Sequence, residues 1–336
     1  MIDFDVLALD AYLRDRLGHG REPLSVQRTE GGMSNPTYFL VRGDWQAVLR
    51  KQPAGELAPS AHAIDREWRV LGALRGTAVP VPEPLHWCGE REVIGTPFYL
   101  MQCLQGRVFH PYAVPGVSAT ERAAMYEAMA AALAAMHRLD PAAIGLVGYG
   151  RPGNYFARQL KRWSEQWRAF RRGDDDNPAL DRVVAWLAER VPESGLQALC
   201  HGDFRMSNLM WHATEPRIIG VLDWELSTLG HPLVDVAYNT QAWRMAADEN
   251  GGLLGAPLHA LGIPSEADYL ERYYALAGST ERLSTFHQVF AMFRGAVGST
   301  GVARRGEQGN GFLPDAACIG QRLARAYATR ALALIS

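Results

Sequence analysis

The pattern of the chain changes near residue 104, and this change constrains the fold more than any other feature. Residues 24–104 carry strand patterns with one helix among them, whereas helical patterns dominate from about residue 118 onward. A chain of 336 residues also exceeds the usual size of one hydrophobic core. We therefore expect an α+β protein with two lobes. The small sheet-rich N-terminal lobe takes residues 1–104, including an N-terminal helix, and the larger, mainly helical C-terminal lobe takes residues 105–336.

The local patterns of the first lobe are typical of a small sheet. Apolar residues at helical spacing predict a helix over 6–17. The segment 37–52 predicts two strands around a Gly-Asp turn, and 96–104 predicts a buried strand. Helical spacing predicts a helix over 60–76, and the prolines of 78–84 favour an extended connector.

The second lobe is expected to be helical except for one hairpin. The segment 208–224 predicts a β-hairpin, with a turn at His-Ala-Thr-Glu-Pro. The predicted helices cover residues 118–139, 154–172, 265–278, 281–298 and 314–334.

Composition excludes several classes of partner. The net charge of −2 gives no overall field that would attract nucleic acid or an anionic membrane. The four cysteines are far apart and form no zinc-like pattern, which is typical of reduced thiols. The N-terminus is acidic from its third residue, unlike a signal peptide, and no apolar run reaches the ~18 residues of a membrane span. We expect a cytoplasmic protein that binds neither nucleic acid nor membrane.

The segment HGDFRMSNLMW, residues 201–211, places polar side chains where a core would not accept them. Taken alone, a turn capped by Asp203 and Asn208 would explain it equally well. The predicted hairpin, however, starts at Asn208 and returns to Asp223, so these three oxygen-bearing side chains could lie close together. Such a set suits Mg²⁺. Phosphoryl transfer needs that metal together with a carboxylate that orients the acceptor hydroxyl.

These motifs carry a family resemblance. LCHGDFRMSNLMW together with IIGVLDWELSTLGHPLVDVA resembles the aminoglycoside phosphotransferase superfamily, the small-molecule relatives of protein kinases. The likeness is greatest to the kinase-like domains associated with acyl-CoA dehydrogenases, and it covers roughly residues 24–330. The resemblance implies a bilobal protein-kinase-like fold, ATP and Mg²⁺ as cofactors, and a small-molecule acceptor.

The resemblance also implies roles in the second lobe. Asp203 matches the catalytic base that accepts or orients the proton of the acceptor hydroxyl. Asn208 and Asp223 match the two positions that hold Mg²⁺, although Asp223 opens Asp-Trp-Glu where protein kinases carry Asp-Phe-Gly. His201 and Asp235 match residues that support the catalytic loop, and we interpret both as structural.

In the first lobe, residues 30–40 resemble the hairpin that covers the nucleotide. Gly-Gly with Ser34 and Asn35 would otherwise be an ordinary turn, but its backbone N–H groups could hold phosphates. The strand that ends the lobe resembles the linker whose backbone, at Gln102 and Leu104, binds the adenine edge.

One cation of the first lobe is expected to pair with the phosphates. Arg50 falls where protein kinases carry the lysine of Val-Ala-Ile-Lys, and Lys51 follows it. Alternation along a strand sends the two side chains to opposite faces, so only one can serve. We favour Arg50, with Lys51 as the alternative. Glu67 matches the family's acidic partner of that cation, and a solvent-facing glutamate is the alternative there.

The substrate is less constrained than the chemistry. Eleven positions separate Asp223 from Val234, too few for the activation loop of a protein kinase, so a peptide acceptor is not expected. The residues after Asp235 carry no acidic excess that would suit a polycation. The stretch 151–172 has seven basic residues and one acidic one. Its residues Arg158, Lys161 and Arg162 could meet an anionic CoA thioester, or could form a solvated helix face.

We therefore predict an ATP- and Mg²⁺-dependent kinase of a small hydroxylated metabolite, a hydroxyacyl-CoA or a hydroxy acid. One alternative is an O-phosphotransferase of an aminoglycoside or aminosugar. The other is a nucleotide-binding pseudokinase subunit that works with an acyl-CoA dehydrogenase, since a functional association with such an enzyme follows from the resemblance.

Overall fold

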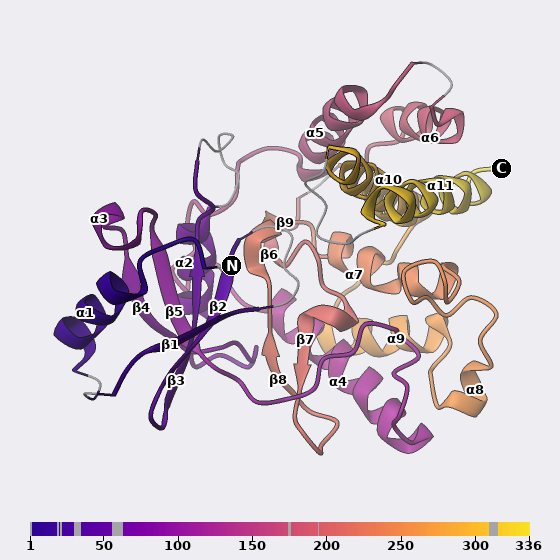
Figure 1. Ribbon diagram of the computed structural model, residues 1–336. Coiled ribbons are helices and arrows are strands. Elements are labelled where there is room, and N and C mark those ends of the chain that lie inside the picture. Colours follow the sequence, from indigo (N-terminus) through magenta and orange to yellow (C-terminus); the bar gives the residue numbers. More distant parts are fainter. Residues whose placement is uncertain are drawn as a thin grey trace. The chain divides into compact units, whose positions relative to one another are not determined.

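The computed structural model describes residues 2–18, 20, 22–29, 35–55, 63–173, 176–193, 195–308 and 315–336. The chain divides into two compact units. The first unit is Met1–Gly106 with Ile219–Glu225, and the second unit is Arg107–Ile218 with Leu226–Ser336. Figure 1 labels the elements of both.

The first unit is built on a five-stranded antiparallel sheet of order β1-β2-β3-β5-β4. Short loops join its strands, as at Gly43, whose φ of 53° belongs to the left-handed region that glycine adopts readily. Its elements are α1 (Val6–Leu17), β1 (Ser25–Arg28), β2 (Thr37–Arg42), β3 (Trp45–Lys51), α2 (Ile64–Leu74), β4 (Pro84–Cys88), α3 (Arg91–Ile94) and β5 (Phe98–Gln102).

The core of the first unit follows the strand period. Tyr38 and Leu40 of β2 point into it with Leu49 of β3, while α1 adds Leu9 and Leu13 from one side of its helix. The sheet therefore has one face that is packed against α1. Arg50 lies on the opposite side of β3 and does not point into this core.

The second unit is mainly helical. Its helices are α4 (Ala119–His137), α5 (Tyr155–Phe170), α6 (Pro178–Ala188), α7 (Leu233–Thr240), α8 (Leu258–Leu261), α9 (Glu266–Ala277), α10 (Thr285–Glu307) and α11 (Ala316–Ala333), with the 3₁₀ segments η1 (Met206–Asn208) and η3 (Gln241–Arg244). Its short strands are β6 (Ala198–Cys200), β7 (Leu209–Trp211) and β9 (Thr228–Gly230). The chain passes between the units within β8 (Ile218–Val221) and within the 3₁₀ segment η2 (Trp224–Leu226).

The long helices α10 and α11 lie side by side and carry much of this core (Figure 1). Small residues allow the close approach: a Cβ on Gly320 of α11 would come within 2.5 Å of the Ala303 backbone nitrogen of α10. Aromatic side chains of α10, among them Phe286, Phe290 and Phe293, fill the space toward α5. This packing fixes the face of α10 that carries Arg294.

Most of the predicted elements are confirmed, and the predicted end of one helix is wrong. Strands β2, β3 and β5, the hairpin strands β7 and β8, and helices α4, α5, α9 and α11 fall where the patterns placed them. Helix α10 runs nine residues beyond the predicted end at 298, because Ser-Thr-Gly-Val-Ala continues its apolar face onto α11. Eight elements have no counterpart among the predictions: strands β1, β4, β6 and β9 and helices α3, α6, α7 and α8. No helix in the described parts of the chain is long and apolar enough to cross a membrane.

Candidate active site

In the first unit, an ion cluster forms around the Arg50 guanidinium on β3. Its Nε lies 2.8 Å from Oε2 of Glu67, which comes from α2, and its Nη2 lies 2.7 Å from Oδ1 of Asp223. A second acid, Glu225, lies 3.7 Å from the same Nη2. The cluster therefore holds one cation and three carboxylates, so it retains a negative balance that a divalent metal could neutralise.

Glu67 is the buried anchor of this cluster. It is 1% exposed, and it accepts hydrogen bonds from Asn35 Nδ2 at 2.7 Å and from the Tyr99 hydroxyl at 2.8 Å. Burial raises the pKa of the Glu67 carboxyl, and the Arg50 charge and these hydrogen bonds offset part of that rise. The adjacent carboxylates raise the pKa of Arg50, so the guanidinium stays charged.

Lys51, the neighbour of Arg50, points to the opposite face of β3. It is 1% exposed, and its Nζ lies 2.8 Å from Oδ2 of Asp3. The period of the strand thus separates the two cations: Arg50 joins Glu67 and Asp223, while Lys51 fastens the N-terminal segment to the sheet.

Asp223 has an unusual backbone. Its φ is 65°, in the left-handed region that costs about 1 kcal/mol for a residue with a side chain, less for Asp and Asn than for others. Gly220, three residues earlier, lies so close to Leu104 that a Cβ there would come within 2.4 Å of Leu104 Cδ1. Close packing at Gly220 therefore fixes the path of the segment that presents the Asp223 carboxylate.

Three further residues of the first unit are predicted to contact the nucleotide: Ser34, Gln102 and Leu104. Ser34 lies outside the described residues, so its predicted contact stays a prediction. The N–H of Gln102 donates to the Glu83 carbonyl oxygen at 2.8 Å, which leaves only its carbonyl for a ligand. No backbone hydrogen bond joins Leu104 to another residue of the described chain.

In the second unit, the segment from His201 to Asn208 forms a tightly folded loop. Gly202 has a φ of 84°, and a Cβ there would come within 2.6 Å of the Leu226 carbonyl oxygen. The Asp203 N–H donates to His201 Nδ1 at 3.1 Å. Both the conformation and the space therefore require glycine at 202, and the turn it allows presents Asp203.

The Asp203 carboxylate is oriented by Asn208. Asn208 Nδ2 donates to Oδ2 of Asp203 at 2.8 Å and to the Asp203 carbonyl oxygen at 2.9 Å. Burial raises the pKa of the Tyr238 phenol, on α7, well above its usual value, and the nearby Asp203 charge raises it further. Since the amide of Asn208 donates toward Asp203, its oxygen is left without a protein partner among the described residues and can serve as a metal ligand.

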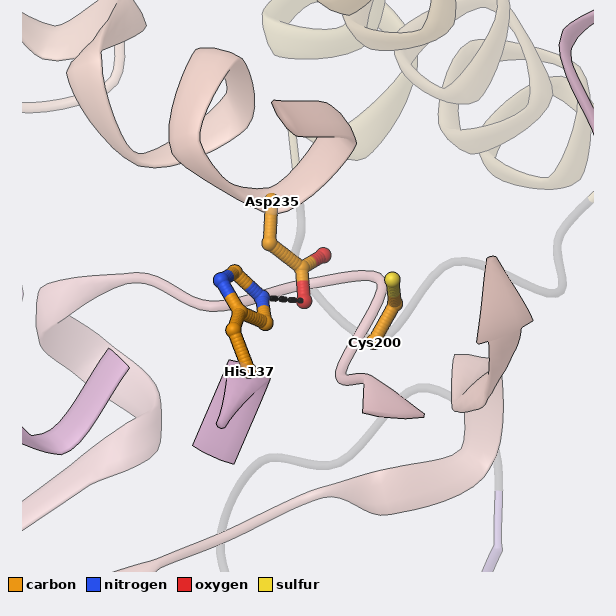
Figure 2. A group of neighbouring side chains, drawn as sticks. All are labelled: His137, Cys200 and Asp235. Atoms are coloured by element: carbon orange, nitrogen blue, oxygen red, sulfur yellow. Dashed lines mark ion pairs between the residues drawn. The ribbon is translucent and has the colours of Figure 1, made fainter. Parts of the chain in front are cut away.

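The Asp235 carboxylate, on α7, anchors this loop through hydrogen bonds. It is completely buried, and its two carboxylate oxygens accept from the N–H groups of His201 at 2.6 Å and Gly202 at 2.8 Å. Figure 2 shows His137 pointing at the same carboxylate, with Nε2 3.5 Å from Oδ2. The Tyr273 hydroxyl lies 2.7 Å from the other nitrogen of His137.

Cys200 lies beside His137 and Asp235, and the three ligand atoms fall within 4.8 Å of one another (Figure 2). A buried His-Cys-Asp group could in principle hold a metal. Here each group already has protein partners: the Asp235 oxygens accept two N–H groups, and Cys200 Sγ contacts the carbonyl oxygens of Ala198 and His231. Burial raises the pKa of the Cys200 thiol well above its usual value. We interpret the group as a brace for the loop.

The basic residues predicted to contact substrate separate into three environments. Arg158 donates from Nη1 to the Pro152 carbonyl oxygen at 2.7 Å and so closes its own loop. Lys161 is exposed and forms a loose ion pair with Glu165 one helical turn away, at 4.0 Å. Arg162 lies over the ring of Trp163, with its guanidinium carbon 5.7 Å from the ring centroid.

Two residues near Asp203 had no counterpart in the sequence analysis: Tyr238 and Arg294. Arg294 donates from Nη2 to the Gly202 carbonyl oxygen at 2.7 Å. A signal for it exists, because Arg294 is the one charged residue in the apolar run Phe286–Val297 apart from His287. A lone arginine within the buried stretch of a helix requires a specific partner.

The brace leads to a prediction for Asp235→Asn. Burial alone would raise the pKa of Asp235, but the nearby His137 side chain and the hydrogen bonds from the loop N–H groups lower it below its usual value. A lowered pKa in the folded state stabilises the protein above the unfolded pKa of about 4, and this contribution is lost as pH falls. Asp235→Asn should lower the free energy of unfolding by about 2 kcal/mol or more at pH 7.

Urea unfolding at pH 7 and at about pH 2–3, below the unfolded pKa of an aspartate, tests this. Asp248→Asn is the control, since Asp248 is an exposed acid paired with Arg322. The loss should shrink at the lower pH, and the control should change stability far less at either pH. An Asp235→Asn loss that is the same at both pH values would contradict an ionised Asp235.

Comparison with known proteins gives consistent matches across the chain. The family model described as "Phosphotransferase enzyme family" matches residues 25–282. Acyl-CoA dehydrogenase family member 10 of Mus musculus is 39% identical over 89% of this chain and 28% of its own length. Acyl-CoA dehydrogenase family member 11 of Homo sapiens is 38% identical over 93% of this chain and 41% of its own length. The chain thus spans less than half of these curated relatives.

Solved structures match over nearly the full length. An inferred aminoglycoside phosphotransferase from Ralstonia eutropha is 40% identical, with a TM-score of 0.87 and 98% of each chain covered. A ternary complex of aminoglycoside phosphotransferase APH(4)-Ia with AMP-PNP and hygromycin B has a TM-score of 0.61 at 20% identity, covering 96% of this chain and 98% of that one. The predicted kinase-like fold is confirmed.

Proposed function

Because the chain belongs to the phosphotransferase enzyme family, we propose that it is a kinase that transfers the γ-phosphoryl group of ATP to a hydroxyl group of a small metabolite. The observation that carries the proposal is the Asp203 loop, in which Asn208 orients the Asp203 carboxylate and the N–H groups of His201 and Gly202 donate to Asp235. Asp203 would accept or orient the proton of the acceptor hydroxyl as the new oxygen–phosphorus bond forms.

The oxygen donors fit a hard divalent cation. Asn208 offers an amide oxygen and Asp223 a carboxylate oxygen, and these are the donors that Mg²⁺ takes alongside waters and phosphates. Bound Mg²⁺ would neutralise the phosphate charge and stabilise the leaving group. AMP-PNP in one structural relative and GDP in another support a purine nucleotide as donor.

Arg50 would bind the phosphates while Glu67 holds its guanidinium in place. The negative balance around Arg50 explains why the nucleotide would enter together with its metal, since bare phosphates would meet the carboxylates of Asp223 and Glu225. Ser34 and Asn35 would contribute to the phosphate-covering hairpin. The carbonyl of Gln102 and the N–H of Leu104 would hold the adenine edge.

For the acceptor we propose a hydroxyacyl-CoA or a free hydroxy acid. Two observations support this class: the curated relatives bear the name of acyl-CoA dehydrogenases, and the second unit carries basic residues close to the Asp203 loop. An aminoglycoside acceptor is the second candidate, because the relative from Ralstonia eutropha bears that name. The names of the curated relatives also support a functional association with an acyl-CoA dehydrogenase. The role that competes with the kinase is a catalytically silent subunit that works with such an enzyme.

A release assay for ADP tests the proposal. Purified protein with Mg-ATP is offered short hydroxy acids, hydroxyacyl-CoAs and aminoglycosides, and phosphorylated product is identified by mass spectrometry. Turnover with a hydroxylated metabolite that disappears without Mg²⁺ would support the kinase. Tight Mg-ATP binding with no turnover on any acceptor would favour the silent subunit instead.

The two neighbouring cations of β3 give a matched prediction. Arg50→Ala should raise KM for ATP or lower kcat by at least about tenfold, because it removes a charged phosphate contact. Lys51→Ala should lower thermal stability through the loss of its contact with Asp3, but leave both kinetic constants within about twofold. Steady-state kinetics and melting curves on both variants decide. The reverse ranking would show that the strand register is assigned wrongly.

A further inference from the structure

Arg294 is a buried cation with unused hydrogen-bonding capacity. It is 7% exposed, and one nitrogen, Nη2, donates to the Gly202 carbonyl oxygen. Its Nε and Nη1 are buried and have no acceptor among the described residues. The guanidinium carbon lies 5.6 Å from the ring centroid of Trp163 and 5.4 Å from that of Tyr238. These rings hold the cation without supplying a negative charge.

A second arginine lies against the same indole ring. The guanidinium carbon of Arg162, on α5, is 5.7 Å from the Trp163 centroid, and Arg162 reaches solvent. Partial burial lowers the pKa of Arg162, and the positive charges of Arg294 and Arg151 lower it further. The indole N–H of Trp163 is likewise buried without an acceptor. Two guanidinium groups therefore lie against one indole ring, where their positive charges repel each other.

The acids of the Asp203 loop and of α7 are already engaged. Asp203 accepts from Asn208, and Asp235 accepts from the loop N–H groups and faces His137. No salt bridge joins Arg151, Arg162 or Arg294 to a carboxylate in the described ranges of the chain. Unpaired charges of one sign at a partly buried position are costly, and binding an anion would relieve that cost.

We propose that Arg162, with Arg294 behind it, forms an oxyanion subsite that binds a carboxylate or phosphate of the acceptor. Arg162 offers the accessible N–H donors, and Arg294 adds the fixed positive charge. The inference rests on the proposed function, because it concerns the substrate of the same site. Arg294 contacts the residue directly before Asp203, so the anion would lie within a few bonds of the hydroxyl that Asp203 acts on.

Substrate pairs that differ only in charge test the subsite. Short hydroxy acids are compared with their methyl esters, and hydroxyacyl-CoAs with the matching pantetheine thioesters, which lack the CoA phosphates. Arg162→Gln should lower kcat/KM for the charged member of a pair by about tenfold or more and leave the neutral member within about twofold. Arg168→Gln, at an exposed position further along α5, is the matched control and should change neither.

The two pairs identify the source of the anion. Loss confined to free hydroxy acids assigns the subsite to a carboxylate, and loss confined to the CoA thioesters assigns it to a phosphate. Equal losses on charged and neutral acceptors would overturn the proposal. Arg294→Lys provides a second variant that keeps a positive charge behind Arg162, and it should preserve the preference for the charged acceptor.

Equilibrium binding separates this inference from the kinase assignment. Calorimetric titration of the wild-type protein and Arg162→Gln with acyl-CoAs and carboxylic acids that lack a hydroxyl group needs no turnover. If the wild-type protein turned over no acceptor but bound one of these anions about tenfold more tightly than the variant, the proposed function would fail and the subsite would stand. Equal affinities in both proteins would remove the subsite whatever the kinase assay shows.

Discussion

Asp203→Asn should lower kcat by about 10²–10⁴, the usual contribution of a positioned general base, while Kd for Mg-ATP stays within a few-fold. Asparagine keeps the shape of the side chain, so the loop and its hydrogen bond from Asn208 Nδ2 can persist. The loss would then reflect the carboxylate's action on the acceptor hydroxyl and not a collapsed site. Steady-state kinetics on the best acceptor and calorimetric titration with Mg-ATP measure the two quantities.

Tyr238→Phe provides the control for orientation as opposed to charge. It removes the phenol hydroxyl that interacts with the Asp203 charge and keeps the carboxylate, so its kcat should fall between those of the wild-type protein and Asp203→Asn. Wild-type turnover by Asp203→Asn would exclude Asp203 as the base. A matching loss of Mg-ATP affinity would show that its role lies with the nucleotide.

The second large effect is expected at the proposed metal ligands. Asp223→Ala should abolish the Mg²⁺-dependent part of ATP binding, and Asn208→Ala should weaken it by about tenfold, because an anionic ligand contributes more to binding a divalent cation than a neutral amide does. Calorimetric titration with ATP, with and without Mg²⁺, measures both. Circular dichroism should show both variants folded, since neither side chain is buried.

Glu225→Gln serves as the comparison for Asp223. Glu225 also faces Arg50, at 3.7 Å, but has no proposed metal contact, so its variant should retain the Mg²⁺ dependence. Unchanged Mg-ATP affinity in both Asp223→Ala and Asn208→Ala would reject the proposed metal ligands. A loss shared equally by Glu225→Gln would assign the effect to the overall charge around Arg50.

Sequence reasoning succeeded where a feature depends on local period. The separation of Arg50 from Lys51 follows from strand alternation, and the contacts between Asp203 and Asn208 follow from their spacing in one loop. The hairpin strands and most long helices were predictable for the same reason. In each case the residues that interact are close in sequence or fixed by one repeat.

It failed where the partner lies far along the chain. The environment of Arg294 depends on Gly202 and Tyr238, and a lone arginine in an apolar run does not reveal which distant backbone it meets. Helix α6 is capped by Asn177, a cap that also suits an ordinary turn. Tertiary contacts determine both features, and neither hydrophobic periodicity nor helix propensity predicts them.

The glycine at 202 bears on how this chain tolerates change. Its positive φ and the Leu226 carbonyl oxygen 2.6 Å from a would-be Cβ exclude even alanine, the smallest substitution. Its N–H and carbonyl are meanwhile fixed by side chains 33 and 92 residues further along the chain. A random mutation can therefore abolish activity while every reactive group is intact. A gene copy that accumulates mutations would lose activity through its scaffold as readily as through Asp203 itself.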